Sequence, residues 1–343
     1  MLKLLRGRLT KTTPKQQKYT KLAATAVAAL GLAGLFRAFV KPDVIHLFDV
    51  TLAFTDLLSV VLAGNGAHFI NRMIAYSKEK RKNMLSISDV VDALDNNVIY
   101  PVFQPIYKLS TDEVVGFEIL ARVDHPVYGR INPVEFIHLI EQAPPEVTQR
   151  FTEYMMRETA RCYMVLHERG KDFQMSINIF SNDLIDARVV SSISRALVQY
   201  GMPFDRLTLE VTEATLMKDL NQAIKVLAGL DSLDVKFALD DYGTHIVSFL
   251  RFSRGMWVDE VKVHSGIACN ERLAGERELM MGILRTARDA GIMVTVIRVK
   301  NEEELEIAKR LGVERVQGNV IAHPMNIDEL IVWMESNGHL SNR

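Results

Sequence analysis

Residues 207–213 read LTLEVTE, and residues 237–244 read FALDDYGT. Both stretches begin with closely spaced apolar residues and lead into acids, Glu210 in the first and the pair Asp240 and Asp241 in the second. Short apolar runs that end on polar residues are typical of strands buried in a parallel sheet. The segment from Asp219 to Leu230 between them has the spacing of an amphipathic helix. Together they predict a strand–helix–strand unit.

The same alternation continues on both sides of this unit and fills residues 87–343. Strands are predicted at Val102–Leu109, Gln174–Ile179, Leu207–Thr212, Lys236–Asp240, Glu260–His264, Met293–Val299 and Arg315–Gln317. Helices are predicted between strands, for example at Asp186–Tyr200, Asp219–Leu230, Arg272–Ala290 and Glu302–Leu311. About 255 residues of such repeats favour an α/β fold of the TIM-like (β/α) barrel type, which has roughly 250 residues.

Polar residues collect where the predicted strands end, which is where barrel enzymes carry their chemistry. They are Glu118, Arg122, Asn178, Glu210, Glu213, Asp240, Asp241 and Lys262. Acidic and amide oxygens from separate strands suit a hard divalent cation. A single acid here has the alternative explanation of a helix N-cap, and Lys262 that of a surface lysine. The adjacent acids Asp240 and Asp241 favour the cation, because they repel each other unless a positive charge lies nearby.

The first 86 residues differ from the rest in composition. Residues 1–21 form a basic arm with seven Lys or Arg and no acid, and residues 22–40 are almost wholly apolar. Nineteen residues of helix nearly span the ~30 Å core of a bilayer. We therefore expect a membrane region over 22–71, with a buried core helix or an uncleaved signal sequence as the alternatives.

A second apolar stretch, Val44 to Ala63, contains three ionisable residues and is a weaker candidate span. The positive-inside rule supports it, because the basic arm and the basic linker at 72–86 would then both face the cytoplasm. One span, or an interfacial amphipathic helix at 44–63, is the alternative. Two spans predict an inner-membrane protein whose domain at 87–343 is cytoplasmic.

The overall composition excludes several classes of protein. The chain has 343 residues, 48% of them hydrophobic, and a formal net charge of −1, which is typical of a folded protein. Its two cysteines, Cys162 and Cys269, support neither a disulfide framework nor a cysteine zinc site. No base-reading motif accompanies the basic arm, so nucleic-acid binding is not expected.

Eight motifs in the region 87–343 resemble those of a known family. They are FQPIY at 103–107, GFEILAR at 116–122, INPVEFIHLIEQ at 131–142, INIFSNDL at 177–184, LTLEVTE at 207–213, FALDDYGT at 237–244, VDEVKV at 258–263 and VQGNVIAHP at 316–324. In this order they resemble the EAL domain, the phosphodiesterase domain of bacterial cyclic di-GMP signalling.

The resemblance implies a role for each matching position. Metal ligands for Mg²⁺ or Mn²⁺ match Glu118, Asn178, Glu210, Asp240 and Asp241. The signature pattern Glu-x-Leu-x-Arg is intact as Glu118, Leu120 and Arg122, whose Arg contacts a phosphate of the cyclic dinucleotide. Lys262 matches the catalytic lysine of the family. Glu213 matches the second Glu of the family's loop motif. Gln104 and Gln317 match polar residues of the site.

One stretch departs from the family pattern. Where the family reads Ala-Glu-Gly-Val-Glu-Thr, residues 296–301 read VIRVKN, so that Ile297 stands at the position of the catalytic base. An isoleucine can neither bind a cation nor accept a proton. Lys300 reverses a second acidic position, and His264 replaces an Asp. A shifted register would instead bring Glu302 forward as the base.

We therefore expect a membrane-anchored protein that binds cyclic di-GMP and hydrolyses it weakly or not at all. The first alternative is an active phosphodiesterase that produces linear pGpG. The second is a protein-interaction module without nucleotide binding. An EAL homodimer or a partner protein is expected by analogy alone.

Overall fold

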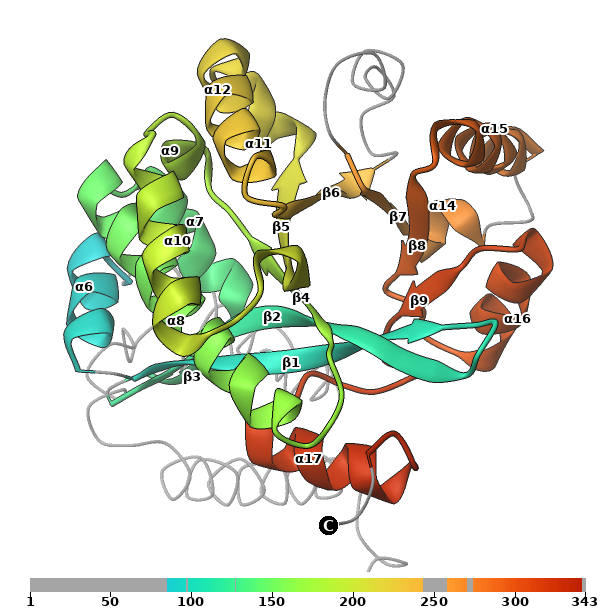
Figure 1. The fold of residues 1–343 in the computed structure, drawn as a ribbon, viewed down its shortest axis with the longest axis horizontal. Helices are drawn as coiled ribbons and strands as arrows, with labels where there is room; N and C mark the ends of the chain where they lie inside the picture. Colours follow the sequence, from blue (N-terminus) through green and yellow to red (C-terminus); the bar gives the residue numbers. More distant parts are fainter. Residues whose placement is uncertain (1–84, 97, 127, 243–257, 270–273, 341–343) are drawn as a thin grey trace, which may run out of the picture. The chain divides into compact units, whose positions relative to one another are not determined.

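In the computed structural model of the chain, the described residues are 85–96, 98–126, 128–242, 258–269 and 274–340. Their strands form one sheet in the order β1-β9-β8-β7-β6-β5-β4-β2-β3, and a further pairing of β1 with β2 closes it. Eight strands thus make a barrel, and β3 extends it beyond β2. Figure 1 shows the ring of strands with helices packed around its outside.

The strands have the following bounds. They are β1 Ile99–Lys108, β2 Glu113–His125, β3 Gly129–Ile131, β4 Gln174–Asn178, β5 Leu207–Thr212, β6 Lys236–Tyr242, β7 Glu260–His264, β8 Met293–Ile297 and β9 Arg315–Gln317. Three predicted strands, those at 207–212, 260–264 and 315–317, have the observed bounds. The others differ at one or both ends by one to three residues.

The principal helices are α6 Ile87–Asp95, α7 Pro133–Gln142, α8 Pro145–His167, α10 Arg188–Tyr200, α12 Leu220–Asp231, α15 Ala274–Ala290, α16 Glu302–Leu311 and α17 Ile327–Ser336. Shorter helices are α9 Ser181–Leu184, α11 Glu213–Met217 and α14 Ser265–Ala268. The predicted helices at 186–200, 219–230 and 302–311 are confirmed within two residues at each end. The end of the helix predicted at 272–290 is confirmed, and its predicted start lies outside the described residues. Glu302 to Glu304 form the first turn of α16, where acids interact favourably with the helix dipole.

One part of the barrel was not predicted. Strand β1 runs antiparallel to both of its neighbours, β2 and β9, whereas the neighbouring strands from β2 through β4 to β9 are parallel. The reason is a tight turn around Asp112, whose φ is 53°, which joins β1 directly to β2 without a helix. The expected regular repeat of parallel strands therefore begins only at β2.

Strand β2 was not predicted, because one of its faces is apolar and the other carries polar residues. Phe117, Ile119 and Ala121 are buried, while Glu118, Leu120 and Arg122 are half-buried. Successive side chains of a strand point to opposite faces, so one face of β2 packs in the core and the other carries polar groups. The polar residues interrupt the apolar run that marks a buried strand.

The expected membrane region lies outside the described residues. Residues 1–84 are not among the described residues. They include the basic arm at 1–21, the membrane region at 22–71 and nearly all of the linker at 72–86. Within the part of the chain that the structure describes, no helix combines the length and the apolar character that a bilayer crossing requires.

The end of β9 lies against the segment that follows β8. Val299 donates its backbone N–H to Gln317 O at 3.1 Å, and Val320 donates to Val299 O at 3.2 Å. A Cβ atom at Gly318 would lie 2.1 Å from Val299 O and 2.4 Å from Val299 N. The close approach of two backbones therefore requires a glycine here, and it fixes the register in which Gln317 enters the barrel.

We predict that Gly318→Ala lowers the free energy of unfolding by about 3 kcal/mol, because backbone atoms rather than a flexible side chain must move. The matched control is Gly282→Ala in the exposed middle of α15, where nothing lies within 4 Å of the added Cβ. That change should raise stability by about 0.5–1 kcal/mol. Urea denaturation of both variants measures the difference, and equal effects would contradict the prediction.

Candidate active site

Three residues of the signature pattern line one face of β2. Glu118, Leu120 and Arg122 alternate with buried apolar residues and are all half-buried. Residues two apart on a strand share a face, so these three side chains all lie on the same face of β2. The pattern Glu-x-Leu-x-Arg thus places an acid, an apolar contact and a guanidinium in a row.

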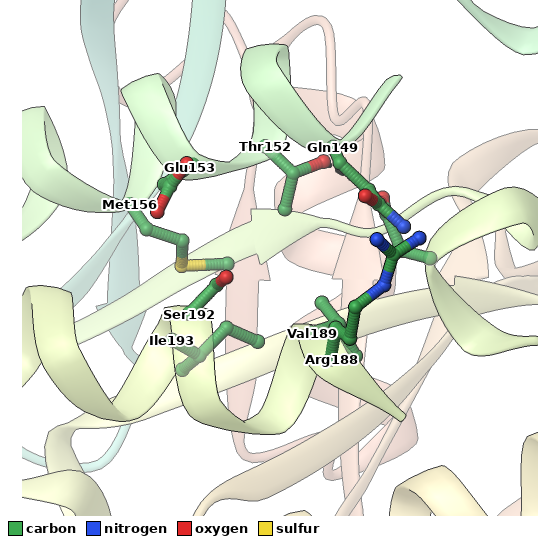
Figure 2. A pocket seen from close by; sticks show the side chains of 9 residues that line it. Gln149, Thr152, Glu153, Met156, Arg188, Val189, Ser192 and Ile193 are labelled. Atoms are coloured by element: carbon green, nitrogen blue, oxygen red, sulfur yellow. Dashed lines mark hydrogen bonds between the residues drawn. The ribbon is translucent and has the colours of Figure 1, made fainter. Parts of the chain in front are cut away.

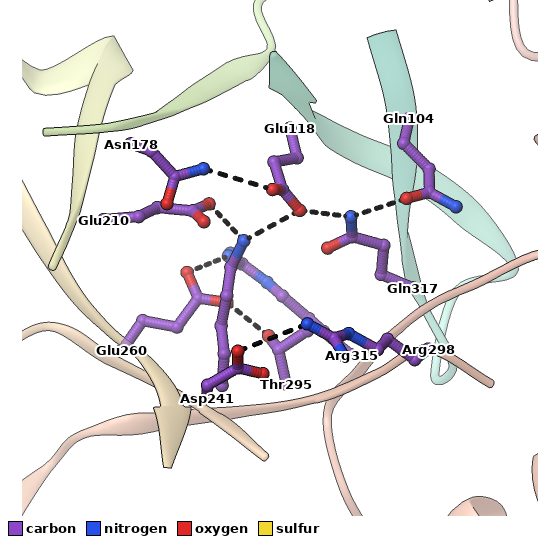
Figure 3. Close-up of polar contacts among 11 residues, drawn as sticks. Gln104, Glu118, Asn178, Glu210, Asp241, Glu260, Thr295, Arg298, Arg315 and Gln317 are labelled. Atoms are coloured by element: carbon purple, nitrogen blue, oxygen red, sulfur yellow. Dashed lines mark hydrogen bonds and ion pairs between the residues drawn. The ribbon is translucent and has the colours of Figure 1, made fainter. Parts of the chain in front are cut away.

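A buried lysine lies at the centre of the site. The Lys262 side chain, from β7, has no exposed surface, and its Nζ forms ion pairs with Glu118 and Glu210. The distance from Nζ to Glu118 Oε2 is 3.4 Å, and the contact with Glu210 Oε1 is closer. Three strands, β2, β5 and β7, meet at this ammonium group. Figure 3 shows Glu118 and Glu210 approaching from separate strands.

Amide side chains hold Glu118 in place. Gln317 Nε2 donates to Glu118 Oε2 at 2.5 Å and to Gln104 Oε1 at 3.1 Å, and Asn178 Nδ2 donates to Glu118 Oε1 at 3.4 Å. Gln104 in turn donates to the backbone oxygen of Ala322 at 3.3 Å. The predicted residues Gln104, Asn178 and Gln317 therefore form a network around Glu118, which Figure 3 shows as a chain of dashed lines.

Burial and neighbouring charges shift the protonation equilibria of the cluster. Burial opposes ionisation of Glu118, but the Lys262 ammonium and the hydrogen bonds from Gln317 and Asn178 outweigh it, so its pKa is lowered. Burial and the Glu118 charge raise the pKa of Glu210 well above its usual value, against the opposing effect of Lys262. The carboxylates, outweighing burial, raise the pKa of Lys262, so it is charged at neutral pH.

Asp240 and Asp241 lie near the end of β6, the strand beside β5 in the sheet. Burial raises the pKa of Asp240 to about 6, with further contributions from the charges of Glu118 and Asp241, while Lys262 opposes the shift. Asp241 has a positive φ of 50° and forms an ion pair with Arg298, whose guanidinium nitrogen lies 3.2 Å from Oδ2. The two adjacent acids thus face different cations, Lys262 on one side and Arg298 on the other.

A second polar group lies next to Lys262 along the strands. Glu260, two residues before Lys262 on β7, is buried, accepts a hydrogen bond from Thr295 and lies 3.7 Å from a guanidinium nitrogen of Arg315. Its charge adds to those that raise the pKa of Lys262. Sequence reasoning missed this group, although an acid between the apolar residues of a predicted strand was a usable signal.

The oxygen donors of the cluster fit one divalent cation. Glu118, Glu210 and Asp240 carry three potential negative charges against the one positive charge of Lys262, and Glu210 Oε2 is buried without a hydrogen-bond partner. Together with Asn178 they offer the all-oxygen set that Mg²⁺ or Mn²⁺ prefers. Among the described residues no three His, Cys, Asp or Glu side chains are already arranged around a metal position.

A second cation does not fit the described residues. Ile297, the last residue of β8, is apolar and only 6% exposed, and it pairs with His264 across the sheet. Asp241, which follows the donor Asp240 in sequence, already forms an ion pair with Arg298. Glu302, which a shifted register would bring forward as the base, is an exposed residue in the first turn of α16.

Arg298 is a site residue that sequence reasoning did not identify. Its φ is 59°, a region that glycine adopts freely and arginine rarely. The sequence carried a signal, because Arg298 stands where the EAL pattern has Gly. Only the structure, however, places its guanidinium beside Asp241.

Two further predicted residues lie at the edge of the site. Glu213 begins α11, three residues after Glu210 and one after the end of β5. Arg122 donates to the Ala121 backbone oxygen at 2.8 Å, and burial lowers its pKa from the usual high value. An arginine nonetheless stays charged at neutral pH, so Arg122 remains a candidate phosphate ligand.

A small cavity outside the barrel is not part of this site. It has a volume of about 20 Å³ and lies between α8 and α10, lined among others by Thr152, Met156 and Ile193 (Figure 2). Such a volume accommodates about one water molecule. A nucleotide would need a far larger space, so the cavity does not compete with the barrel as a ligand site.

We predict that Lys262→Met lowers the free energy of unfolding by about 3–5 kcal/mol in EDTA, because it leaves buried carboxylates without their cation. The loss should be smaller at pH 5 than at pH 8, since protonated acids no longer need a counter-charge. The control is Lys236→Met, an exposed lysine 3.6 Å from Asp259, which should change stability by less than about 1 kcal/mol. Denaturant titrations at both pH values measure this, and a pH-independent loss would contradict the electrostatic explanation.

Comparisons with known proteins agree with this geometry. The chain is 26% identical over 270 residues to the bifunctional diguanylate cyclase/cyclic di-GMP phosphodiesterase MucR of Pseudomonas aeruginosa, covering 78% of this chain and 38% of that protein. It is 28% identical over 271 residues to the cyclic di-GMP phosphodiesterase NbdA of the same organism, covering 78% and 34%. The chain thus spans little more than a third of the length of these relatives.

A solved structure is also similar. The PaMucR phosphodiesterase in complex with c-di-GMP superposes with a TM-score of 0.65 at 26% identity, over 71% of this chain and 98% of that one. The model of the family described as EAL domain matches residues 87–324. With the closed barrel and the motifs in place, the chain belongs to the EAL domain family.

Proposed function

We propose that this protein binds cyclic di-GMP and hydrolyses it weakly or not at all. The observation that carries the proposal is the combination of an intact Glu118, Leu120 and Arg122 on β2 with the buried Ile297 at the end of β8. The first set keeps the groups that hold a nucleotide, and the second lacks a group that activates water. Relatives named as cyclic di-GMP phosphodiesterases support the choice of ligand.

Nucleotide binding follows from the chemistry of the residues on β2. The planar guanidinium of Arg122 can donate two parallel hydrogen bonds to a phosphate. Leu120, between Arg122 and Glu118 on the same face, offers an apolar contact to a base or sugar. The half-buried position of all three residues leaves part of each side chain accessible to a ligand.

One divalent ion would be held by Glu118, Asn178, Glu210 and Asp240. When bound, Mg²⁺ or Mn²⁺ neutralises charge on a phosphate and polarises its oxygens. In this chain Lys262 supplies a fixed positive charge at the same place, because it is buried among those carboxylates. Gln317 and Asn178 orient Glu118 by hydrogen bonds, so that its carboxylate does not rotate away from the cluster.

Hydrolysis lacks a proton acceptor at the position of Ile297. A side chain of carbon and hydrogen cannot take a proton from water, and loss of a general base commonly costs about 10²–10⁴-fold in rate. The residues that follow do not restore one, since Arg298 and Lys300 are cations.

An active phosphodiesterase is the second candidate function. The specific observation in its favour is the preserved cluster of Lys262 with Glu118 and Glu210, together with Glu213 at the start of α11. Such an enzyme would use one metal ion and another proton acceptor, and would release linear pGpG.

We predict that titration of the purified protein with cyclic di-GMP in the presence of Mg²⁺ or Mn²⁺ gives saturable binding and that chromatography recovers the nucleotide unchanged. Arg122→Lys should weaken binding about tenfold, because it removes the paired hydrogen bonds but keeps the charge. The control is Arg285→Lys on the exposed face of α15, which should bind like the wild type.

Linear product at ordinary enzyme rates would overturn the assignment and favour the active phosphodiesterase. Absence of any binding, with and without the metal ions, would favour the protein-interaction module instead.

Membrane attachment is a separate part of the proposal and rests on residues 1–86. The apolar stretches within 22–71 and the basic residues on both sides support an anchor in the bacterial inner membrane with the EAL domain in the cytoplasm. We predict that the full chain floats with lipid vesicles in a density gradient and remains bound in 1 M salt. A variant without residues 1–71 should stay at the bottom, and a full chain that salt releases would contradict membrane insertion.

A further inference from the structure

The residue after the buried Ile297 has an unusual backbone conformation. Arg298 has a φ of 59°, and Asp241, the acid that it contacts, has a φ of 50°. Side chains with a Cβ atom rarely adopt this region, because the Cβ approaches the carbonyl oxygen too closely. Backbone strain of this kind concentrates at ligand-binding and catalytic sites. Two strained residues that contact each other therefore call for an explanation beyond folding.

The ion pair between them does not provide that explanation through stability. The Arg298 side chain is 60% exposed and that of Asp241 34%, and ion pairs with this exposure stabilise a protein very little. Glycine at 298 would relieve the strain at no cost in burial. The stability of the fold therefore does not explain why residue 298 is an arginine. The location of its positive charge beside Asp241 does.

The guanidinium lies beside the acids that would otherwise bind a second ion. One nitrogen of Arg298 is 3.2 Å from Asp241 Oδ2, and Asp241 follows Asp240, a donor of the first ion. Ser265 donates to the backbone oxygen of Arg298 at 3.0 Å, which fixes the chain at this point. A single contact to Asp241 uses one of the donors of the guanidinium, and an arginine has five N–H groups in all.

We infer that Arg298 takes the place of a second divalent cation in this protein: its guanidinium neutralises Asp241 and donates hydrogen bonds to a phosphate of the bound nucleotide. The inference deepens the proposed function and rests on it for the identity of the ligand. The site then binds one divalent ion rather than two, and Arg298 contributes to nucleotide affinity.

The place of Arg298 in the barrel suits a ligand with two phosphates. Arg122 belongs to β2, and Arg298 follows β8, which is separated from β2 by β9 and β1 in the sheet. The two arginines therefore belong to parts of the ring that are three strand positions apart. A cyclic dinucleotide has two phosphates in one ring, so each arginine can contact one of them.

The first experiment counts bound metal ions without nucleotide. Mn²⁺ is titrated into the full-length wild type and into the double variant Ile297→Glu/Arg298→Gly, and free Mn²⁺ is followed by electron paramagnetic resonance. We expect one bound ion per wild-type chain and two per double variant, because that variant gains a carboxylate and releases Asp241. Two ions in the wild type, or no second ion in the double variant, would overturn the inference.

The second experiment measures cyclic di-GMP affinity at saturating Mg²⁺. Arg298→Gly suits the positive φ, so it should fold at least as stably as the wild type while it weakens binding about tenfold. Arg298→Asn tolerates the same backbone conformation and should weaken binding equally. Arg285→Gln on α15 removes an exposed charge elsewhere and should leave affinity unchanged.

The two experiments separate this inference from the proposed function. Unchanged affinity in both Arg298 variants, with binding intact in the wild type, overturns the role of Arg298 alone. If the wild type binds no cyclic di-GMP, the proposed function fails and the phosphate contact with it, while the Mn²⁺ count still decides whether Arg298 replaces a cation.

Discussion

The buried ammonium group of Lys262 is the constraint on which the site depends. A lysine without exposed surface is costly unless carboxylates surround it, and Glu118 and Glu210 do so from two other strands. Their attraction holds β2, β5 and β7 in one register, and the amides of Gln317 and Asn178 then fix Glu118. Because removing any one partner leaves a buried charge, the members of the cluster depend on one another energetically.

The site is therefore asymmetric about its two aspartates. Asp240 faces the Lys262 cluster, where an excess of carboxylate oxygen suits one divalent ion. Asp241 faces Arg298, which supplies the opposite charge from the protein itself. Ile297, the last residue of β8, is apolar and buried, and the residue that follows it is the cation Arg298. Under the proposed function, this division separates nucleotide binding from hydrolysis.

Most of the fold could be predicted from local pattern. Strands such as β5 and β8 are short runs rich in apolar residues, and α16 begins at an acidic turn after the cap residue Asn301. Strand β2 could not be recognised, because its inward face carries the functional groups and breaks the apolar pattern. The antiparallel direction of β1 also escaped prediction, since a tight turn, rather than a composition, determines it.

The sequence by itself determined the family, the identity of the oxygen donors and the absence of a carboxylate at Ile297, because these depend on which residue types follow which strands. Only the tertiary structure decided that Lys262 lies between Glu118 and Glu210, that Gln104 reaches Glu118 through Gln317, and that Arg298 meets Asp241. These contacts join residues 52 to 213 positions apart. Their geometry follows from closure of the barrel and from a positive φ, neither of which is expressed in local sequence.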